Sequence, residues 1–168
     1  TPYPSIQDAI RDKLRRANSY NDYKFHLIDT GGIDVSKEFF NDEIIVQASI
    51  AIDESDVVVF IVDGKESLNQ NDFKVRDMLK KAGKTVIVAV NKIDNIKRFD
   101  NIYEFYELGV DKIIPISAEH NEGIKTLLDE ITSSFKNVST TDYEEDVVKF
   151  CVIGRPNVGK SSLINALL

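Results

Sequence analysis

The chain has 168 residues, of which 42% are hydrophobic and 29% are charged, and this length suits one hydrophobic core better than two. Its formal net charge of -7 argues against wrapping of a nucleic acid by this chain alone, because such affinity rests mainly on Lys and Arg neutralising phosphates. The single cysteine, Cys151, excludes an intramolecular disulfide, and no apolar run approaches the roughly 20 residues of a membrane span. We therefore expect a cytoplasmic protein without a membrane contact.

The first apolar pattern lies near the start of the chain. Ile6, Ile10 and Leu14 follow Pro4 and Ser5 with the spacing of a short helix. Its basic residues fall mostly on the polar side and are interpreted as a solvated face rather than a partner site. They are Arg11, Lys13, Arg15 and Arg16.

Short runs of β-branched and apolar residues recur along the chain, as expected for strands buried on both faces. They cover residues 25–28, 57–62, 85–90, 113–116 and 147–153. Segments with helical spacing alternate with them, at 45–52, 73–83 and 124–131, and Gly83 is the predicted C-cap of the second. Such alternation predicts an α/β fold with a mostly parallel sheet covered by helices.

The stretch at 136–146 is rich in Ser, Thr, Asp and Glu and has no apolar periodicity, so it is predicted to be a linker or exposed loop. The segment that follows it, 147–168, contains one strand, a glycine loop and the beginning of a helix. That is too little to fold alone.

Residues 154–161 read GRPNVGKS, which matches a phosphate-binding P-loop and lies between a predicted strand and a predicted helix. Glycines let such a loop turn its N–H groups toward phosphates. Lys160 would place its charge near the outer phosphates, and the Ser161 hydroxyl would bind Mg²⁺. The nucleotide-binding residues predicted here are Asn157, Val158, Gly159, Lys160, Ser161 and Ser162.

The tetrapeptide NKID at 91–94 directly follows a predicted buried strand and indicates recognition of guanine. Asp94 can accept hydrogen bonds from the guanine N1–H and exocyclic amine, whereas adenine would leave a buried carboxylate unpaired. We expect Asn91 and Lys92 to steady this loop and to flank the ring.

The sequence DTGG at 29–32 follows another predicted strand and is typical of a segment that senses the γ-phosphate. Asp29 would hold Mg²⁺ through water, and the N–H of Gly32 would bond to a γ-phosphate oxygen. Adjacent glycines also permit the loop to move when that phosphate leaves.

A third loop ends the predicted strand at 113–116. It contains Ser117, Ala118 and Glu119, and the backbone of Ala118 is expected to reach the guanine oxygen. This triplet gains its meaning only beside the other motifs.

Together, GRPNVGKSS, DTGG, NKID and SAE resemble the tandem-domain ribosome-assembly GTPases called Der or EngA. FHLIDTGGID, QASIAIDESDVVVFIVDG and YEFYELG resemble the first G domain of that family, and VVKFCVIGRPNVGKSSLINALL resembles the start of the second. The resemblance covers residues 23–168. It implies GTP hydrolysis with Mg²⁺, coupled to maturation of the large ribosomal subunit.

The chain also departs from the family's pattern. Family members begin with a first P-loop, which the given sequence lacks, and continue through a second G domain, of which it has only the start, and a C-terminal RNA-binding-like domain, which it also lacks. Residues 1–22 match poorly, with Ser5 in the place of a Mg²⁺-binding threonine. The position of Asn157 implies a K⁺ site by resemblance, and Ile33 replaces a water-orienting glutamine, which predicts slow intrinsic hydrolysis.

Each element of one G domain is expected once, in rotated order. We therefore predict a three-layer P-loop NTPase fold whose elements stand in circularly permuted order, as a single domain over residues 1–168. Extended, residues 136–146 would span up to roughly 36 Å, at about 3.3 Å per residue, so the terminal strand could return to its own sheet. A fragment of a tandem protein, or a strand-swapped oligomer, would contain the same strands, helices and motifs. We favour a sheet that is completed by the terminal strand of the same chain.

Two classes of function fit these motifs. One is a GTP-hydrolysing assembly factor, and the other is a GTP- or GDP-binding module, or a fragment, without turnover. The two histidines, His26 and His120, are expected to have core or surface roles rather than catalytic ones.

Overall fold

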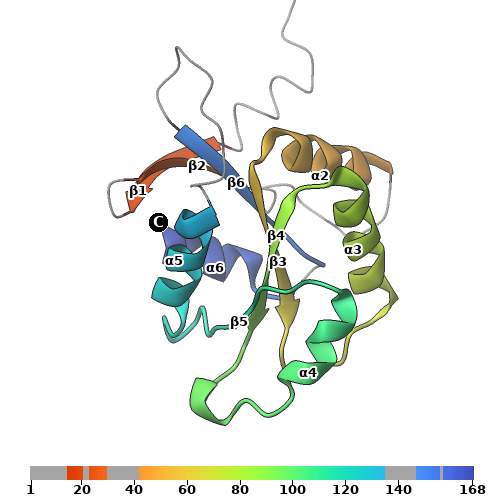
Figure 1. The fold of residues 1–168 in the computed structure, drawn as a ribbon, viewed down its shortest axis with the longest axis vertical. Helices are drawn as coiled ribbons and strands as arrows, with labels where there is room; N and C mark the ends of the chain where they lie inside the picture. Colours follow the sequence, from red (N-terminus) through yellow and green to blue (C-terminus); the bar gives the residue numbers. More distant parts are fainter. Residues whose placement is uncertain (1–14, 21–22, 30–41, 135–146, 156) are drawn as a thin grey trace, which may run out of the picture.

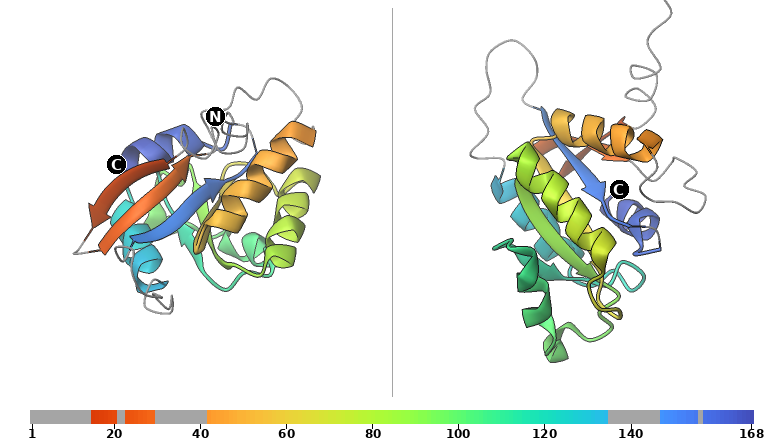
Figure 2. Two further views of the ribbon diagram at one scale, coloured as in Figure 1. Left: turned by 90° about the horizontal axis from the view of Figure 1, so that it is seen from above. Right: turned by 90° about the vertical axis from the view of Figure 1, so that its right-hand side faces the viewer.

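The computed structural model of this protein describes residues 15–20, 23–29, 42–134, 147–155 and 157–168. Within these residues the chain forms one six-stranded sheet with helices on both faces (Figures 1 and 2). The strands are β1 Arg15–Tyr20, β2 Tyr23–Asp29, β3 Val57–Asp63, β4 Thr85–Asn91, β5 Ile113–Pro115 and β6 Val147–Ile153.

The last strand in the sequence, β6, lies inside the sheet, whose order is β1-β2-β6-β3-β4-β5. It pairs in parallel with β2 on one side, where Ile28 faces Cys151, and with β3 on the other, where Val59 faces Val152. Among the described strands, β1 alone is antiparallel to its neighbour. The terminal segment therefore completes the sheet of the same chain.

The helices lie on both sides of the sheet, and the last of them, α6, follows the final strand. They are α2 Asp42–Glu54, α3 Gln70–Ala82, α4 Ile102–Phe105, α5 Ile124–Ser134 and α6 Lys160–Leu167, with the 3-10 turns η1 Ile96–Arg98 and η2 Tyr106–Leu108. Helix α3 begins at a capping box formed by Asn69 and Asp72. It ends at Gly83, whose φ of 67° is the left-handed conformation that glycine adopts readily.

The sheet separates two hydrophobic cores. Every residue of β3 is buried, and because successive side chains of a strand point to opposite faces, alternate residues enter different cores. Val59 packs with residues of α5 and α6 such as Leu127 and Leu163. Phe60 packs in the second core, with residues of α2 and α3 such as Ile52 and Val75.

The α/β fold expected from the sequence is confirmed. All predicted strands are present with bounds that differ by at most two residues at either end, and Gly83 is the C-cap of α3 as predicted. The prediction of helix for Arg15 and Arg16 is wrong, because both belong to β1 and pair with β2. Cross-strand pairing here overrides the local helical spacing.

Other expectations cannot be compared with the structure. The remainder of the predicted N-terminal helix with Ser5, the linker at 136–146, and residues 30–33 with Gly32 and Ile33 lie outside the described residues. Among the helices that are described, none is long and apolar enough to cross a bilayer.

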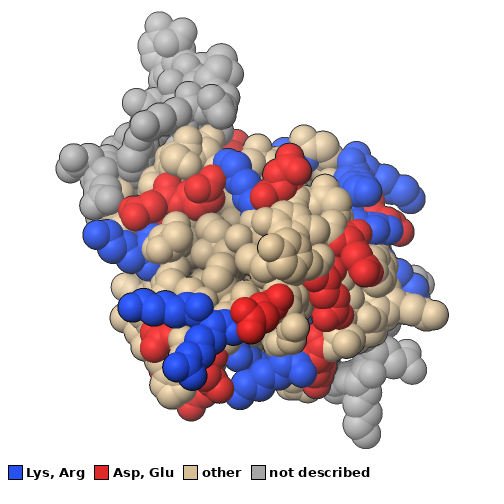
Figure 3. All heavy atoms as spheres, turned by 60° about the horizontal axis from the view of Figure 1, so that its bottom comes forward, with Lys and Arg blue, Asp and Glu red and all other residues tan. Residues whose placement is uncertain are grey.

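Charged residues are mixed over the surface. On the face drawn in Figure 3, basic and acidic side chains lie side by side, and its described residues form no extended surface of one sign.

Cys151 offers a direct test of the place of β6 in the sheet. The side chain is buried between β2 and β3, and burial raises the pKa of its thiol to about 12. Because the thiolate is the reactive form, we expect Ellman's reagent at pH 8 to modify the folded chain only as fast as the sheet opens. The reaction is followed by absorbance, with chain unfolded in guanidinium chloride as the control that reacts promptly. Equally prompt reaction of the folded chain would contradict the insertion of β6.

Candidate nucleotide-binding site

The predicted motifs meet at one edge of the sheet. β6 leads into the P-loop, β4 into residues 91–94, and β5 into residues 117–119, and these strands are parallel. The carboxyl ends of parallel strands lie at the same edge, where ligands of open α/β sheets bind. The insertion of β6 therefore places the phosphate-binding motif beside the base-recognition motifs.

The P-loop has the conformation of an anion cradle. Asn157 and Gly159 have φ values of 66° and 100°, both in the left-handed region. A side chain at residue 159 would collide with the Nδ2 atom of Asn91, so both the backbone angle and the space require glycine. Nζ of Lys160 donates a hydrogen bond to the carbonyl oxygen of Gly154, at 2.8 Å, across the loop.

Helix α6 begins directly at this loop. Its N-cap is Gly159, which has no side chain with which to cap the first turn. The first backbone N–H groups of a helix carry partial positive charge and satisfy their hydrogen bonds with an anion when no cap is present. The cradle thus fits a phosphate group.

Asn91, the last residue of β4, connects two of the loops. Its side chain is buried, and its Nδ2 donates to the carbonyl oxygen of Val158 at 2.9 Å. Its Oδ1 accepts a hydrogen bond from the backbone N–H of Ala118 at 3.0 Å. The Ala118 N–H is thus held by Asn91, and its predicted contact with the guanine oxygen stays a prediction.

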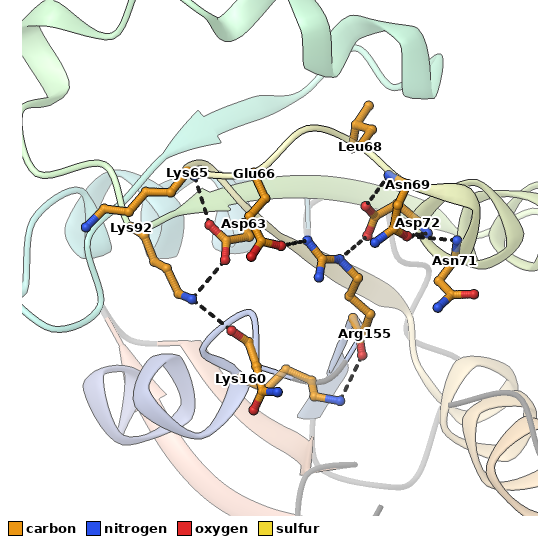
Figure 4. Close-up of polar contacts among 12 residues, drawn as sticks. Asp63, Lys65, Glu66, Leu68, Asn69, Asn71, Asp72, Lys92, Arg155 and Lys160 are labelled. Atoms are coloured by element: carbon orange, nitrogen blue, oxygen red, sulfur yellow. Dashed lines mark hydrogen bonds and ion pairs between the residues drawn. The ribbon is translucent and has the colours of Figure 1, made fainter. Parts of the chain in front are cut away.

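Lys92 adds a second connection to the P-loop. Its Nζ lies 2.8 Å from the carbonyl oxygen of Asn157 and 2.8 Å from Oδ2 of Asp63, a buried carboxylate at the end of β3 (Figure 4). The same carboxylate accepts a hydrogen bond from the backbone N–H of Lys65 at 2.8 Å. Neither Asp63 nor Lys65 is among the binding residues predicted from the sequence.

Asp94 does not have the burial that the argument for guanine selection assumed. Its side chain is 59% exposed and forms an ion pair with Nζ of Lys65 at 3.2 Å. Nε2 of His120 lies 4.0 Å from the same carboxylate. The carboxylate lines a cavity of about 120 Å³. That cavity is lined by Lys65, Asn91, Lys92, Asp94, Ser117, Glu119, Gly159 and Ser162.

The residues predicted to hold Mg²⁺ are described only in part. Ser161 is exposed in the first turn of α6, and its hydroxyl is a hard oxygen donor of the kind that Mg²⁺ prefers. Asp29 ends β2, where its backbone pairs with Val152 of the strand that leads into the P-loop. Ser5, Gly32 and the side chain of Asp29 lie outside the described part of the structure, so their roles in binding Mg²⁺ stay predictions.

Comparison with known proteins agrees with this geometry. Residues 6–137 match the family described as the elongation factor Tu GTP binding domain, and residues 149–168 match the family described as 50S ribosome-binding GTPase. The chain is 48% identical over 163 residues to GTPase Der of a Geobacillus species, and 46% identical over 160 residues to GTPase Der of Staphylococcus carnosus. These alignments cover 97% and 95% of this chain but only 37% of each relative, so the chain spans little more than a third of their length.

Solved structures show the same similarity. Era of Aquifex aeolicus, crystallised with GDP and an aluminium fluoride anion, matches with a TM-score of 0.61 and 26% identity, covering 80% of this chain and 48% of that one. The FeoB G-domain of Methanococcus jannaschii matches with a TM-score of 0.53 and 26% identity, covering 78% of this chain and 90% of that one.

The connection made by Asn91 can be tested by Asn91→Ala. We expect the free energy of unfolding to fall by about 2–3 kcal/mol, because the buried carbonyl of Val158 and the buried N–H of Ala118 both lose their partner. The control is Asn101→Ala at an exposed position, which should change stability by no more than about 0.5 kcal/mol. Denaturant titration measures both, and a variant of Asn91 as stable as the control variant would contradict the bridging role.

Proposed function

We propose that this chain, which belongs to the elongation factor Tu GTP-binding domain family, binds one guanine nucleotide with Mg²⁺ and hydrolyses GTP to GDP and phosphate. The observation that carries this proposal is that one small cavity is lined both by Asp94 and by Gly159. Its lining combines residues of the base-recognition motif with residues of the phosphate cradle and α6, so one ligand that carries both a base and phosphates would contact both groups.

Asp94 is proposed to select the base. The guanine N1–H and exocyclic amine would donate to its carboxylate, and Lys65 would then exchange its partner for the ligand or for water. Adenine offers no such donor pair, so it would displace Lys65 from Asp94 without giving the carboxylate hydrogen bonds in return. Ser117, Ala118 and Glu119 would border the base from the loop after β5.

Lys160 is proposed to bind the outer phosphates, together with the N–H groups at the start of α6. Loop residues Asn157, Val158 and Gly159 would surround the same phosphates, with Ser162 beside them. Bound Mg²⁺ neutralises phosphate charge in such sites. Ser161 would hold it directly, and Asp29 would do so through water.

The hydrolytic step is proposed to depend on Lys160 and on the N–H of Gly32, both directed at oxygens of the γ-phosphate. Ile33 cannot orient water by hydrogen bonding, which is the reason to expect a slow intrinsic rate. Asn157 is proposed to help bind K⁺, whose charge would act where other GTPases place an arginine.

We also propose a domain organisation and a cellular role for the chain that carries this site. Closure of the site within one chain supports a single G domain over 1–168, in circularly permuted order, rather than a strand-swapped oligomer. Relatives named GTPase Der, and the match of residues 149–168 to a 50S ribosome-binding GTPase family, support a cytoplasmic role in large-subunit assembly.

Base selection is tested by calorimetric titration with GDP. We expect one site per chain in a monomer, binding that weakens when Mg²⁺ is chelated, and loss of at least about a hundredfold in GDP affinity for Asp94→Asn. An amide at this position donates where a carboxylate accepts, so the variant should gain affinity for xanthosine diphosphate. Asp100→Asn, at an exposed position outside the site, is the matched control. Unchanged GDP affinity in the Asp94 variant would exclude its proposed role.

Hydrolysis separates the enzyme from a binding module without turnover. In single-turnover reactions we expect slow phosphate release in Na⁺ and release faster by about tenfold or more in K⁺, with the K⁺ effect lost in Asn157→Ala. The same assay with large ribosomal subunits tests the proposed partner. Binding of GTP without phosphate release in either salt, with or without subunits, would favour the module.

A further inference from the structure

Arg155 is a P-loop residue whose side chain has no assigned role. It extends from the P-loop toward the start of α3 and is only 12% exposed (Figure 4). Its Nη2 lies 2.7 Å from Oε2 of Glu66, and its Nε lies 3.2 Å from Oδ1 of Asp72. The guanidinium therefore pairs with two carboxylates on a neighbouring segment instead of facing the phosphate cradle.

Asp72 is the more demanding partner because its side chain is only 1% exposed. Its second oxygen, Oδ2, accepts a hydrogen bond from the backbone N–H of Asn69 at 3.0 Å, which completes the capping box of α3. Burial raises the pKa of Asp72, and the hydrogen bond from Asn69 and the charge of Arg155 offset this effect only in part. A buried carboxylate of this kind strongly favours keeping its cation in place.

The other end of the P-loop is attached to the same region of the chain. Asp63 holds Lys92, and Lys92 donates to the carbonyl oxygen of Asn157. Residues 63–72 are thus connected to the P-loop on both sides of position 156, directly through Arg155 before it and by way of Lys92 to Asn157 after it. Asn157 and Gly159, the two residues with left-handed backbone conformation, lie in this part of the P-loop. Their conformation has to be maintained if the backbone N–H groups of the loop are to converge on a phosphate.

We propose that Arg155 is a positioning residue: by pairing with Asp72 and Glu66 it fixes the first half of the P-loop against α3, so that the phosphate cradle is formed before the nucleotide arrives. This inference rests on the proposed function. Preorganisation of this kind raises affinity for the groups that the cradle binds, the phosphates, and leaves recognition of the base to Asp94.

The test is Arg155→Met, which keeps much of the side chain's length and removes both ion pairs. Affinities for GDP and inosine diphosphate are measured by calorimetry at a temperature where circular dichroism shows the variant folded. We expect both affinities to fall by about tenfold or more and their ratio to stay constant, because inosine lacks only the exocyclic amine that Asp94 recognises. Arg155→Lys, which keeps the charge without the two-pronged geometry, should give an intermediate affinity.

The matched control is Lys112→Met, which removes a surface ion pair with Glu130, at 2.9 Å, and should leave GDP affinity unchanged. If Arg155→Met does not fold, Glu66→Gln removes the exposed half of the interaction and should lower both affinities in the same proportion by about twofold to threefold. If the folded variants keep their GDP affinity, or if the ratio of GDP affinity to inosine diphosphate affinity changes, the inference about Arg155 is overturned and the proposed function is not. Wild-type protein that binds no GDP would overturn the proposed function and the inference with it.

Discussion

The side chain of Asn91 holds together two loops that are far apart in the sequence. Its amide donates to Val158 in the P-loop, and its carbonyl accepts from Ala118 in the loop after β5. The contact with Val158 exists because β6 lies between β2 and β3, which brings residues near the end of the chain to the carboxyl edge of the sheet, whereas the contact with Ala118 joins the ends of the neighbouring strands β4 and β5. A buried amide satisfies these polar groups in one geometry, so it fixes the distance between the phosphate cradle and the base-recognition loop.

The site is built from rigid and exchangeable contacts. Buried side chains make the rigid ones: Asn91 to Val158, Asp63 to Lys92, and Asp72 to Arg155. The pair between Lys65 and Asp94 is exposed, and pairs of that kind contribute little stability. This difference suits a binding site, because the lysine can be displaced at small cost while the loops that surround the ligand stay in place.

Much of the fold and of the site follows from local sequence patterns. Buried parallel strands read as continuous apolar runs, so their positions and the resemblance to Der or EngA could be predicted, and the relatives confirm that resemblance. Strand β1 could not be predicted, because its residues show no strand alternation and its place depends on pairing with β2. Asp63, Lys65 and Arg155 were missed for a related reason, since their partners are brought near only by the sheet order. The signal that could have found Asp63 is its position at the end of a buried strand, at the same edge as Asn91.

The arrangement depends on the C-terminal strand completing its own sheet, and a crystal structure of the chain with GDP and Mg²⁺ tests this most directly. We expect β6 between β2 and β3 of the same molecule, with the phosphates against Lys160 and the base against Asp94. A structure in which β6 of one molecule enters the sheet of another, or in which Lys160 and Asp94 contact separate ligands, would contradict it.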